Sequence, residues 1–99
     1  MTSNILSVGV AVIDFVMNVD EMPRRAEKYR ANDAAIVGGG CGANAAVAIT
    51  RLGGDCTLAA RLGDDFIGDM IISGLEKEGV DCGLVRQFDG CRSSFSSIF

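Results

Sequence analysis

The sequence predicts an α/β fold, in which strands alternate with helices along the chain. An apolar run rich in β-branched residues lies near the N-terminus, and a glycine-rich turn leads into an alanine-rich helical pattern. A second strand and helix then follow. The chain has 99 residues, of which 48% are hydrophobic. A chain of this length and composition can bury a core of its own as one small domain.

The N-terminal third predicts three strands. Residues 5–13 form a nearly continuous apolar run, which is typical of a parallel strand covered on both faces, and Asp14 ends it. Residues 15–19 predict a short second strand. Residues 27–37 mix polar and apolar side chains, which predicts an exposed third strand after a polar loop that contains Pro23.

The rest of the chain predicts two helices and three further strand-like segments. Asp64 and Asp65 precede the second helix, so we interpret them as N-terminal capping residues without a catalytic role. In chain order the elements are a helix from residue 45 to the glycines at 53 and 54, a strand at 56–60, a helix at 66–75 that ends before Gly79, and strands at 84–85 and 93–99.

Composition excludes several classes of function. The net charge is −4 and the basic residues are mostly scattered, which argues against a nucleic-acid partner. The apolar run at 5–13 is too short to span a bilayer and lacks a basic segment before it, so no membrane partner is expected. There is no histidine and no C-x-x-C pair among the four cysteines, which predicts no metal site and reduced thiols in a cytoplasmic protein.

The stretch Gly38–Asn44 organises the chain. It contains four glycines in five positions, so its backbone can adopt positive φ angles and approach a ligand closely. Backbone amides at the start of the following helix lack intrahelical acceptors and point outward. The segment is therefore suited to presenting main-chain donors to a polar group, although a helix-entry turn without a ligand fits the same pattern.

One alternative comes from the same glycines. Gly38, Gly40 and Ala43 match the dinucleotide-binding fingerprint G-x-G-x-x-A, which would make the chain part of an oxidoreductase. Against this alternative, a whole strand and Asp14 precede the glycines, whereas the fingerprint normally follows the first strand. No Gly-Lys-Ser/Thr follows either, so the segment is not a P-loop.

Three linked motifs resemble the N-terminal part of the ribokinase-like (PfkB) carbohydrate kinases. They are Val8-Gly9 followed by Asp14, the segment Gly38–Ala48 followed by Arg51-Leu52-Gly53, and Arg61-Leu62-Gly63-Asp64-Asp65-x-x-Gly68. Lys28-Tyr29 and Arg92-Ser93-Ser94 resemble segments of the ketohexokinase and sulfofructose kinase branch. The resemblance implies a three-layer α/β sandwich with a small β-sheet lid, in which residues 1–99 form the sugar-binding part and lid strands lie near 15–19, 27–37 and 93–99.

The resemblance also implies an activity, the ATP-dependent phosphorylation of a sugar hydroxyl. The family's catalytic base and ATP site lie in a Gly-Ala-Gly-Asp signature, which does not occur in these 99 residues. We therefore expect catalytic residues, ATP and Mg²⁺ to belong mainly to a part beyond residue 99, and this chain alone to be inactive. The chain stops inside an apolar strand pattern, which predicts a longer natural polypeptide. A homodimer paired through the lid is expected, because an exposed lid edge favours such pairing.

The resemblance assigns sugar binding to a small set of residues. A carboxylate at Asp14 can accept hydrogen bonds from two hydroxyls, and Asn44 offers both a donor and an acceptor, although a turn aspartate and a capping asparagine are the plain alternatives. Cys41 departs from the lysine common in the ribokinase branch, which favours a ketose or a related sugar over ribose. The candidate substrate-binding residues are Asp14, Lys28, Gly39, Gly40, Cys41, Asn44, Ser96 and Ile98.

Three of these candidates rest on weaker observations. Lys28 could reach a polar or anionic tail of the sugar from the lid, but a solvated lysine on an edge strand is the plainer interpretation. Strand register alone does not settle which face of 93–99 points inward, so Ser96 and Ile98 are candidates only. A non-catalytic sugar-binding or dimerisation fragment is the remaining alternative.

Overall fold

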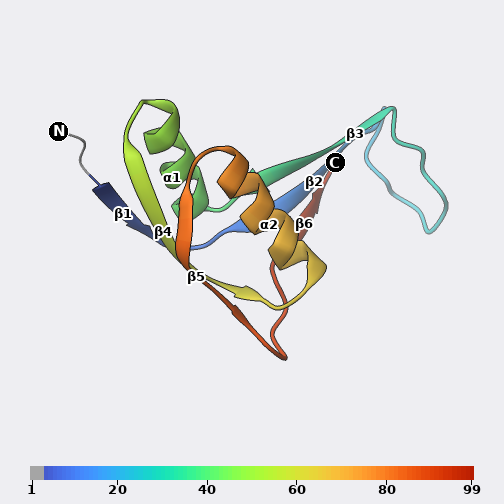
Figure 1. The fold of residues 1–99 in the computed structure, drawn as a ribbon. Coiled ribbons are helices and arrows are strands. Elements are labelled where there is room, and N and C mark those ends of the chain that lie inside the picture. The colour runs from blue at the N-terminus through green and yellow to red at the C-terminus, as the bar shows by residue number, and fades with distance from the viewer. Residues whose placement is uncertain (1–3) are drawn as a thin grey trace.

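The computed structural model describes residues 4–99, which form two three-stranded sheets and two helices (Figure 1). One sheet is parallel and has the strand order β1-β4-β5. The other has the order β3-β2-β6, with β3 antiparallel and β6 parallel to the central strand. The elements are β1 (Asn4–Val8), β2 (Val12–Asn18), β3 (Asp33–Gly39), α1 (Cys41–Arg51), β4 (Asp55–Gly63), α2 (Phe66–Lys77), β5 (Asp81–Phe88) and β6 (Phe95–Ile98).

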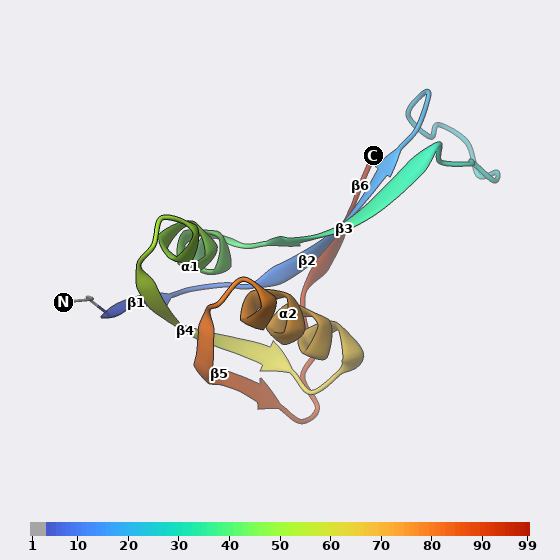
Figure 2. The same cartoon turned by 45° about the horizontal axis from the view of Figure 1, so that its top comes forward.

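Both helices lie on the same face of the parallel sheet (Figure 2). α2 connects β4 directly to β5, whereas α1 is the last part of a longer connection from β1 to β4 that also contains β2 and β3. Right-handed crossovers that run in the same direction along a sheet place their helices on one side. The core between these layers centres on Leu58 of β4, whose side chain is fully buried. Ile67, Ile71 and Leu75 of α2 repeat every four residues and form the buried stripe of that helix.

Close backbone packing fixes α1 against the end of β1. A Cβ atom on Gly42 would lie only 2.8 Å from the Cα atom of Gly9, so neither residue can carry a side chain without moving the other. The Ser7 hydroxyl adds a 2.9 Å hydrogen bond to the Gly42 carbonyl. The helix-stop prediction for Gly53 and Gly79 is confirmed, because each follows a helix and has a φ near +90°.

The prediction of one strand over residues 5–13 is wrong. The chain leaves the parallel sheet after Val8 and enters the second sheet at Val12. The Gly9 amide makes a last 3.2 Å bond to the Ala59 carbonyl, and the Val10 carbonyl then accepts from the Ala43 amide of α1. One apolar run therefore contains parts of two separate strands. The prediction failed because a continuous run of hydrophobic residues does not indicate where the chain passes from one sheet to another.

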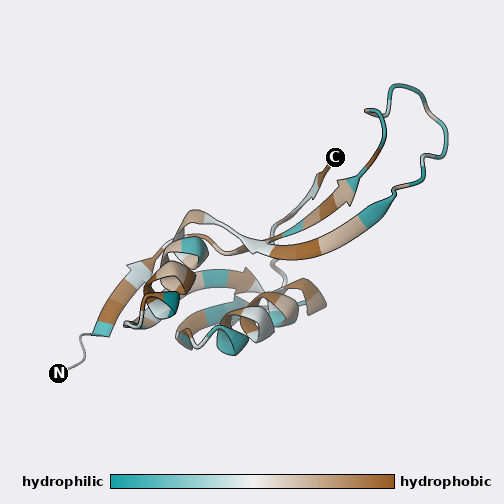
Figure 3. Ribbon diagram, turned by 90° about the horizontal axis from the view of Figure 1, so that it is seen from above, coloured by the Kyte–Doolittle hydropathy of each residue, from teal (hydrophilic) through white to brown (hydrophobic). Residues whose placement is uncertain are grey.

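The second sheet contains the three segments that were expected as lid strands, with shifted bounds. The segment expected at 27–37 forms a strand at Asp33–Gly39 instead, and residues 19–32 form a long loop that projects from the β2–β3 hairpin (Figure 2). Figure 3 shows hydrophobic residues along these strands and mostly hydrophilic residues in the projecting loop. A role for this sheet as a lid over a sugar stays a prediction.

The remaining helices and strands are of the predicted type but differ from the prediction in length. α1 begins at Cys41 rather than at residue 45, and β4 and β5 extend well beyond 56–60 and 84–85. Neither helix of the described chain, residues 4–99, is long and apolar enough to cross a membrane.

Candidate functional site

The candidate site lies on one face of the second sheet, around Asp14 at its centre. Asp14 is the third residue of β2, and its register partners are Val37 on β3 and Ser96 on β6. The expectation that Asp14 follows the first strand at the edge of the parallel sheet is therefore wrong. The Ser96 hydroxyl donates a 2.5 Å hydrogen bond to Oδ1 of Asp14, which joins residues 82 positions apart.

The second carboxylate oxygen of Asp14 faces the backbone of Gly39. A Cβ atom on Gly39 would lie 2.6 Å from Oδ2 of Asp14 and 3.1 Å from a methyl group of Val12. Gly39 is thus a glycine because the carboxylate occupies the space where a side chain would start. The structure brings Asp14, Gly39 and Ser96 together, although they come from three different strands.

Gly40 makes the turn from β3 into α1. It has a φ of +93°, and a Cβ atom there would lie 2.6 Å from the Val10 carbonyl oxygen. It is the N-cap residue of α1 and provides no side-chain acceptor for the helix amides. The Val10 carbonyl accepts a 3.1 Å bond from the Ala43 amide, so one amide expected to be free for a ligand is already paired.

Cys41 and Asn44 lie in the first turn of α1, and both are exposed. Because Gly40 is the N-cap, the alternative interpretation of Asn44 as a capping residue is wrong. The Asn44 amide donates to the Gly40 carbonyl at 2.8 Å as the first regular helical bond, while its side chain stands on the helix surface.

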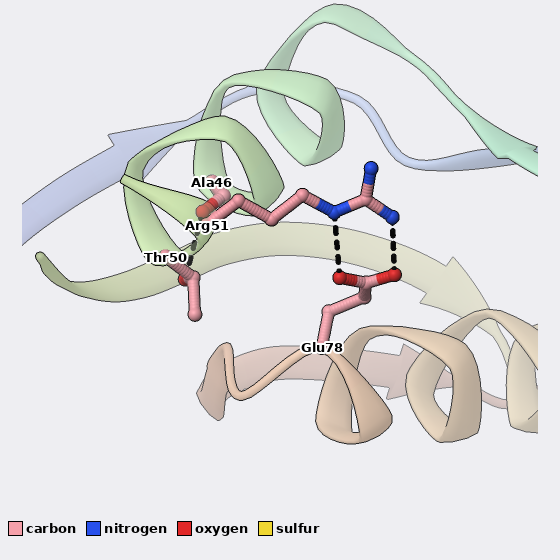
Figure 4. A network of polar contacts seen from close by, with 4 residues as sticks. All are labelled: Ala46, Thr50, Arg51 and Glu78. Carbon is pink, nitrogen blue, oxygen red and sulfur yellow. Dashed lines mark hydrogen bonds and ion pairs between the residues drawn. The ribbon is translucent and has the colours of Figure 1, made fainter. Parts of the chain in front are cut away.

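A cleft of about 510 Å³ opens between α1 and α2, and Asn44 is the only predicted site residue that lines it. Its walls are mostly apolar and include Ile13, Ile36 and Val47. Arg51 and Glu78 also line the cleft and connect the two helices through a bidentate ion pair, with N–O distances of 2.9 and 2.5 Å (Figure 4). The cleft therefore adjoins the candidate site without containing Asp14, Gly39 or Gly40.

Ile98 lies on the second sheet near Asp14, whereas Lys28 lies in a loop. Ile98 pairs with Val16, two positions along from Asp14 and Ser96, so it lies on the same face of the sheet as both. Lys28 lies in the loop 19–32, not on an edge strand as expected. In the part of the chain that the structure describes, its side chain has no hydrogen bond or ion pair that would direct it toward Asp14.

Sequence reasoning missed the structural role of Ser93. Ser93 is 7% exposed, and its hydroxyl accepts a 3.0 Å hydrogen bond from the Gly63 amide. Its own amide donates to Asp65 at 2.8 Å, while the same carboxylate accepts from the Gly68 amide. These hydrogen bonds hold the pKa of Asp65 below its ordinary value, led by the bond from the Ser93 amide. The capping prediction for Asp65 is thereby confirmed.

The titratable residues offer little else for chemistry. No group of three histidine, cysteine or carboxylate side chains that could hold a metal ion occurs within residues 4–99. Burial, followed by the nearby charges of Glu76 and Asp81, raises the pKa of the Cys82 thiol, which makes it less reactive. The described residues therefore provide hydrogen-bonding groups for a polar ligand and no assembled set of acid, base and metal.

Comparison with known proteins identifies the class that this fold and site define. The family model described as pfkB family carbohydrate kinase matches residues 2–99. The chain therefore belongs to the PfkB family of carbohydrate kinases. The dinucleotide-binding alternative fails on topology as well, since the glycines begin within the end of β3, a strand that is antiparallel to its neighbour β2.

Two relatives illustrate the match, and both are sugar kinases by name. The chain is 34% identical over 98 residues to a ribokinase of Dictyostelium discoideum, covering 99% of this chain and 31% of the relative. It is 36% identical over 96 residues to fructokinase-1 of Oryza sativa, covering 95% of this chain and 28% of that protein. The chain thus spans about a third of the length of the relatives it matches.

Solved structures share the fold. A candidate ribokinase from Agrobacterium tumefaciens superposes with a TM-score of 0.89 at 31% identity, covering 98% of this chain and 32% of that one. The ribokinase of Cryptococcus neoformans in complex with ADP gives a TM-score of 0.75 at 27% identity, covering 97% and 30%. The predicted ribokinase-like α/β fold is therefore confirmed.

Proposed function

We propose that this chain is the sugar-binding part of an ATP-dependent kinase that phosphorylates a sugar hydroxyl. The observation that carries the proposal is the Asp14 carboxylate, held by Ser96 on one side and lying against the bare backbone of Gly39 on the other. A carboxylate accepts hydrogen bonds only, so it suits a ligand rich in hydroxyl groups. Membership of the PfkB family supports a sugar as that ligand.

The roles of the candidate residues follow from their places around Asp14. Asp14 would accept hydrogen bonds from neighbouring sugar hydroxyls, and the main chain of Gly39 and Gly40, which carries no side chain, would border the sugar. Asn44 and Cys41 would border the sugar from the first turn of α1, and Ile98 would cover an apolar part of it. Lys28 would contribute only through movement of the loop 19–32.

We infer that the transfer chemistry belongs to residues beyond residue 99. A base there would deprotonate the sugar hydroxyl, and backbone amides there would hold the phosphates of ATP, which supplies the phosphoryl group together with Mg²⁺. Relatives solved with ADP or with an ATP analogue support ATP as the second substrate. The described residues would contribute by holding and orienting the sugar, which is a large part of phosphoryl-transfer catalysis.

The sugar that we propose is a ketose or a related furanose. Relatives include ribokinases, deoxyribokinases and fructokinases, so both pentoses and ketoses are represented among them. Cys41 stands where the ribokinase branch often has a lysine, and a thiol does not replace the three hydrogen-bond donors of an ammonium group.

We also propose a cytoplasmic homodimer that pairs through the second sheet. Phe95 is 59% exposed there, on the face opposite Asp14, and Ile36 on the same face is 58% exposed where it borders the cleft between α1 and α2. The outer strands β3 and β6 each have one edge that pairs with no other strand of residues 4–99. An apolar surface beside unpaired strand edges favours association with a second copy.

The proposed activity is tested on the complete polypeptide with a panel of aldoses and ketoses. Sugar-dependent release of ADP is expected with at least one furanose or ketose, and no turnover of NAD(P)H. A second measurement uses residues 1–99 alone in calorimetric titration with ATP and Mg²⁺, where no saturable binding is expected. Hydride transfer without sugar-dependent ADP release would contradict the proposed kinase activity. A saturable ATP site on residues 1–99 would contradict the proposal that ATP is bound by residues beyond residue 99.

A further inference from the structure

We infer that Ser96 is a positioning residue, which fixes the carboxylate of Asp14 in the orientation that binds the sugar; this rests on the proposed function. The two residues lie side by side on parallel strands, Ser96 on β6 and Asp14 on β2. The Ser96 hydroxyl donates a 2.5 Å hydrogen bond to Oδ1 of Asp14. This bond is the only side-chain hydrogen bond to Asp14 within residues 4–99, where no cation pairs with that carboxylate.

The two carboxylate oxygens of Asp14 have different neighbours. Oδ1 is engaged by Ser96, whereas Oδ2 lies over Gly39, where a Cβ atom would come within 2.6 Å of it. Oδ2 therefore borders the glycine turn Gly39–Gly40, where the backbone carries no side chain. Rotation of the carboxylate group would turn Oδ2 away from that turn, and the bond to Ser96 opposes the rotation.

Fixing the carboxylate in advance improves binding without any new contact to the ligand. An Asp side chain that is free to rotate must lose that freedom when it binds, and the loss weakens the complex. Ser96 is exposed, so its hydroxyl is not needed to satisfy a buried polar group. Its bond to Asp14 consequently contributes more to the geometry of the site than to stability.

A direct contact between Ser96 and the sugar is the competing explanation, and a double-mutant cycle separates the two. The complete enzyme is prepared with Ser96→Ala, both in the natural background and together with Asp14→Ala. A residue that acts through Asp14 loses its effect once the carboxylate is gone. A residue that touches the sugar itself keeps its effect in both backgrounds.

Neighbouring positions provide controls. Ser97 pairs with Phe15 and faces the opposite side of the same sheet, so Ser97→Ala removes a similar hydroxyl away from Asp14. Ser96→Thr keeps a hydroxyl at the correct position, and Ser96→Cys keeps the volume but is a weak donor. Melting temperatures of all variants identify any that fail to fold, and Ser96→Cys then takes the place of Ser96→Ala.

For Ser96→Ala we expect kcat/KM for the sugar to fall roughly 5- to 20-fold, with the KM for ATP unchanged. In the Asp14→Ala background the same change should alter kcat/KM less than about twofold. Ser96→Thr should restore activity, Ser96→Cys should be intermediate, and Ser97→Ala should match the natural enzyme. An equal loss in both backgrounds, or no loss in either, would overturn the positioning role. An absence of sugar-dependent ADP release from the natural enzyme would instead overturn the proposed function, and this inference with it.

Discussion

The Ser93 amide donates a 2.8 Å hydrogen bond to Oδ2 of Asp65, whose Oδ1 caps helix α2 through the Gly68 amide at the same distance. One carboxylate thereby ties the start of α2 to the segment that leads into β6. The Ser93 hydroxyl completes the junction through the Gly63 amide at the end of β4. The second sheet, which carries Ser96, is thus anchored to the parallel sheet within three residues of that serine.

Replacing Asp65 should therefore destabilise the protein more than replacing its neighbour Asp64. Asp65→Ala removes both the helix cap and the acceptor for the Ser93 amide, whereas Asp64 has no side-chain hydrogen bond within residues 4–99. We expect a lower melting temperature for Asp65→Ala and little change for Asp64→Ala, measured by calorimetry on the complete enzyme. Equal melting temperatures for the two variants would contradict this role.

The contribution of Asp65 should also depend on pH. Its pKa is lowered in the folded state, chiefly by the Ser93 amide and then by the Gly68 amide. A carboxylate of this kind stabilises the fold fully above its unfolded pKa of about 4, and the stabilisation disappears as the pH falls through the lower folded pKa. The difference in melting temperature between the natural enzyme and Asp65→Ala should accordingly be constant near neutral pH and shrink below about pH 4.

The ion pair between Arg51 and Glu78 should stabilise the cleft only weakly. Both side chains are reached by solvent, at 68% and 34% exposure, and exposed pairs of this kind contribute little. Arg51 lowers the pKa of Glu78, so the stabilisation is present at neutral pH and lost in acid. Glu78→Gln should lower the melting temperature slightly in dilute buffer and have no effect at about 1 M salt, where the Debye length is about 3 Å.

Glu76→Gln is the matched control for that measurement. Glu76 also lies near the end of α2, and within residues 4–99 it forms no ion pair. Its replacement should leave the melting temperature unchanged at low and at high salt. A salt-independent loss in Glu78→Gln would mean that packing, and not the ion pair, connects the two helices there.

Replacing Gly39 by alanine should impair sugar use without unfolding the enzyme. The added methyl group would meet Oδ2 of Asp14 at 2.6 Å, and the end of that side chain can move aside more easily than the backbone. Displacing the carboxylate should reduce kcat/KM for the sugar at least tenfold, on the order of one hydrogen bond to a charged group. Gly38→Ala is the control, because a Cβ atom there meets nothing within 4 Å.

The amide variant of Asp14 tests the carboxylate itself. Asp14→Asn keeps the shape of the side chain but loses the charge and one acceptor oxygen. We expect kcat/KM for the sugar to fall by about one to two decades, with little change in the KM for ATP or in the melting temperature. A lower melting temperature with normal sugar kinetics would show that Asp14 stabilises the second sheet and does not bind the sugar.

Local patterns predicted a large part of the fold. The α2 helix followed from the spacing of Ile67, Ile71 and Leu75 and from the capping residue Asp65, all of which act within a few turns of chain. The glycine turn and the helix that follows it were predicted for the same reason. Family membership followed from three motifs together, each of which lies within a short stretch of the chain.

The candidate site was predicted only in part. Asp14, Gly39 and Gly40 were identified from their motifs, but Asp14 was placed at the end of the wrong strand. The bond from Ser96 to Asp14 was not predicted, since it depends on the register of two strands that are far apart in the sequence. Lys28 was misplaced because a mixture of polar and apolar residues does not by itself separate an exposed strand from a polar loop.

The sequence by itself determined the family, the order of strands and helices, and the positions where only glycine fits a turn. The tertiary structure decided where residues 5–13 change sheets, which strand receives β6, and which side chains surround Asp14. The reason is physical. Capping, turns and helix periodicity involve residues within a few positions of one another, whereas a strand in a sheet could pair with any of several apolar strands that are distant in the sequence. Only the folded chain selects Ser96, 82 residues away, as the partner of Asp14.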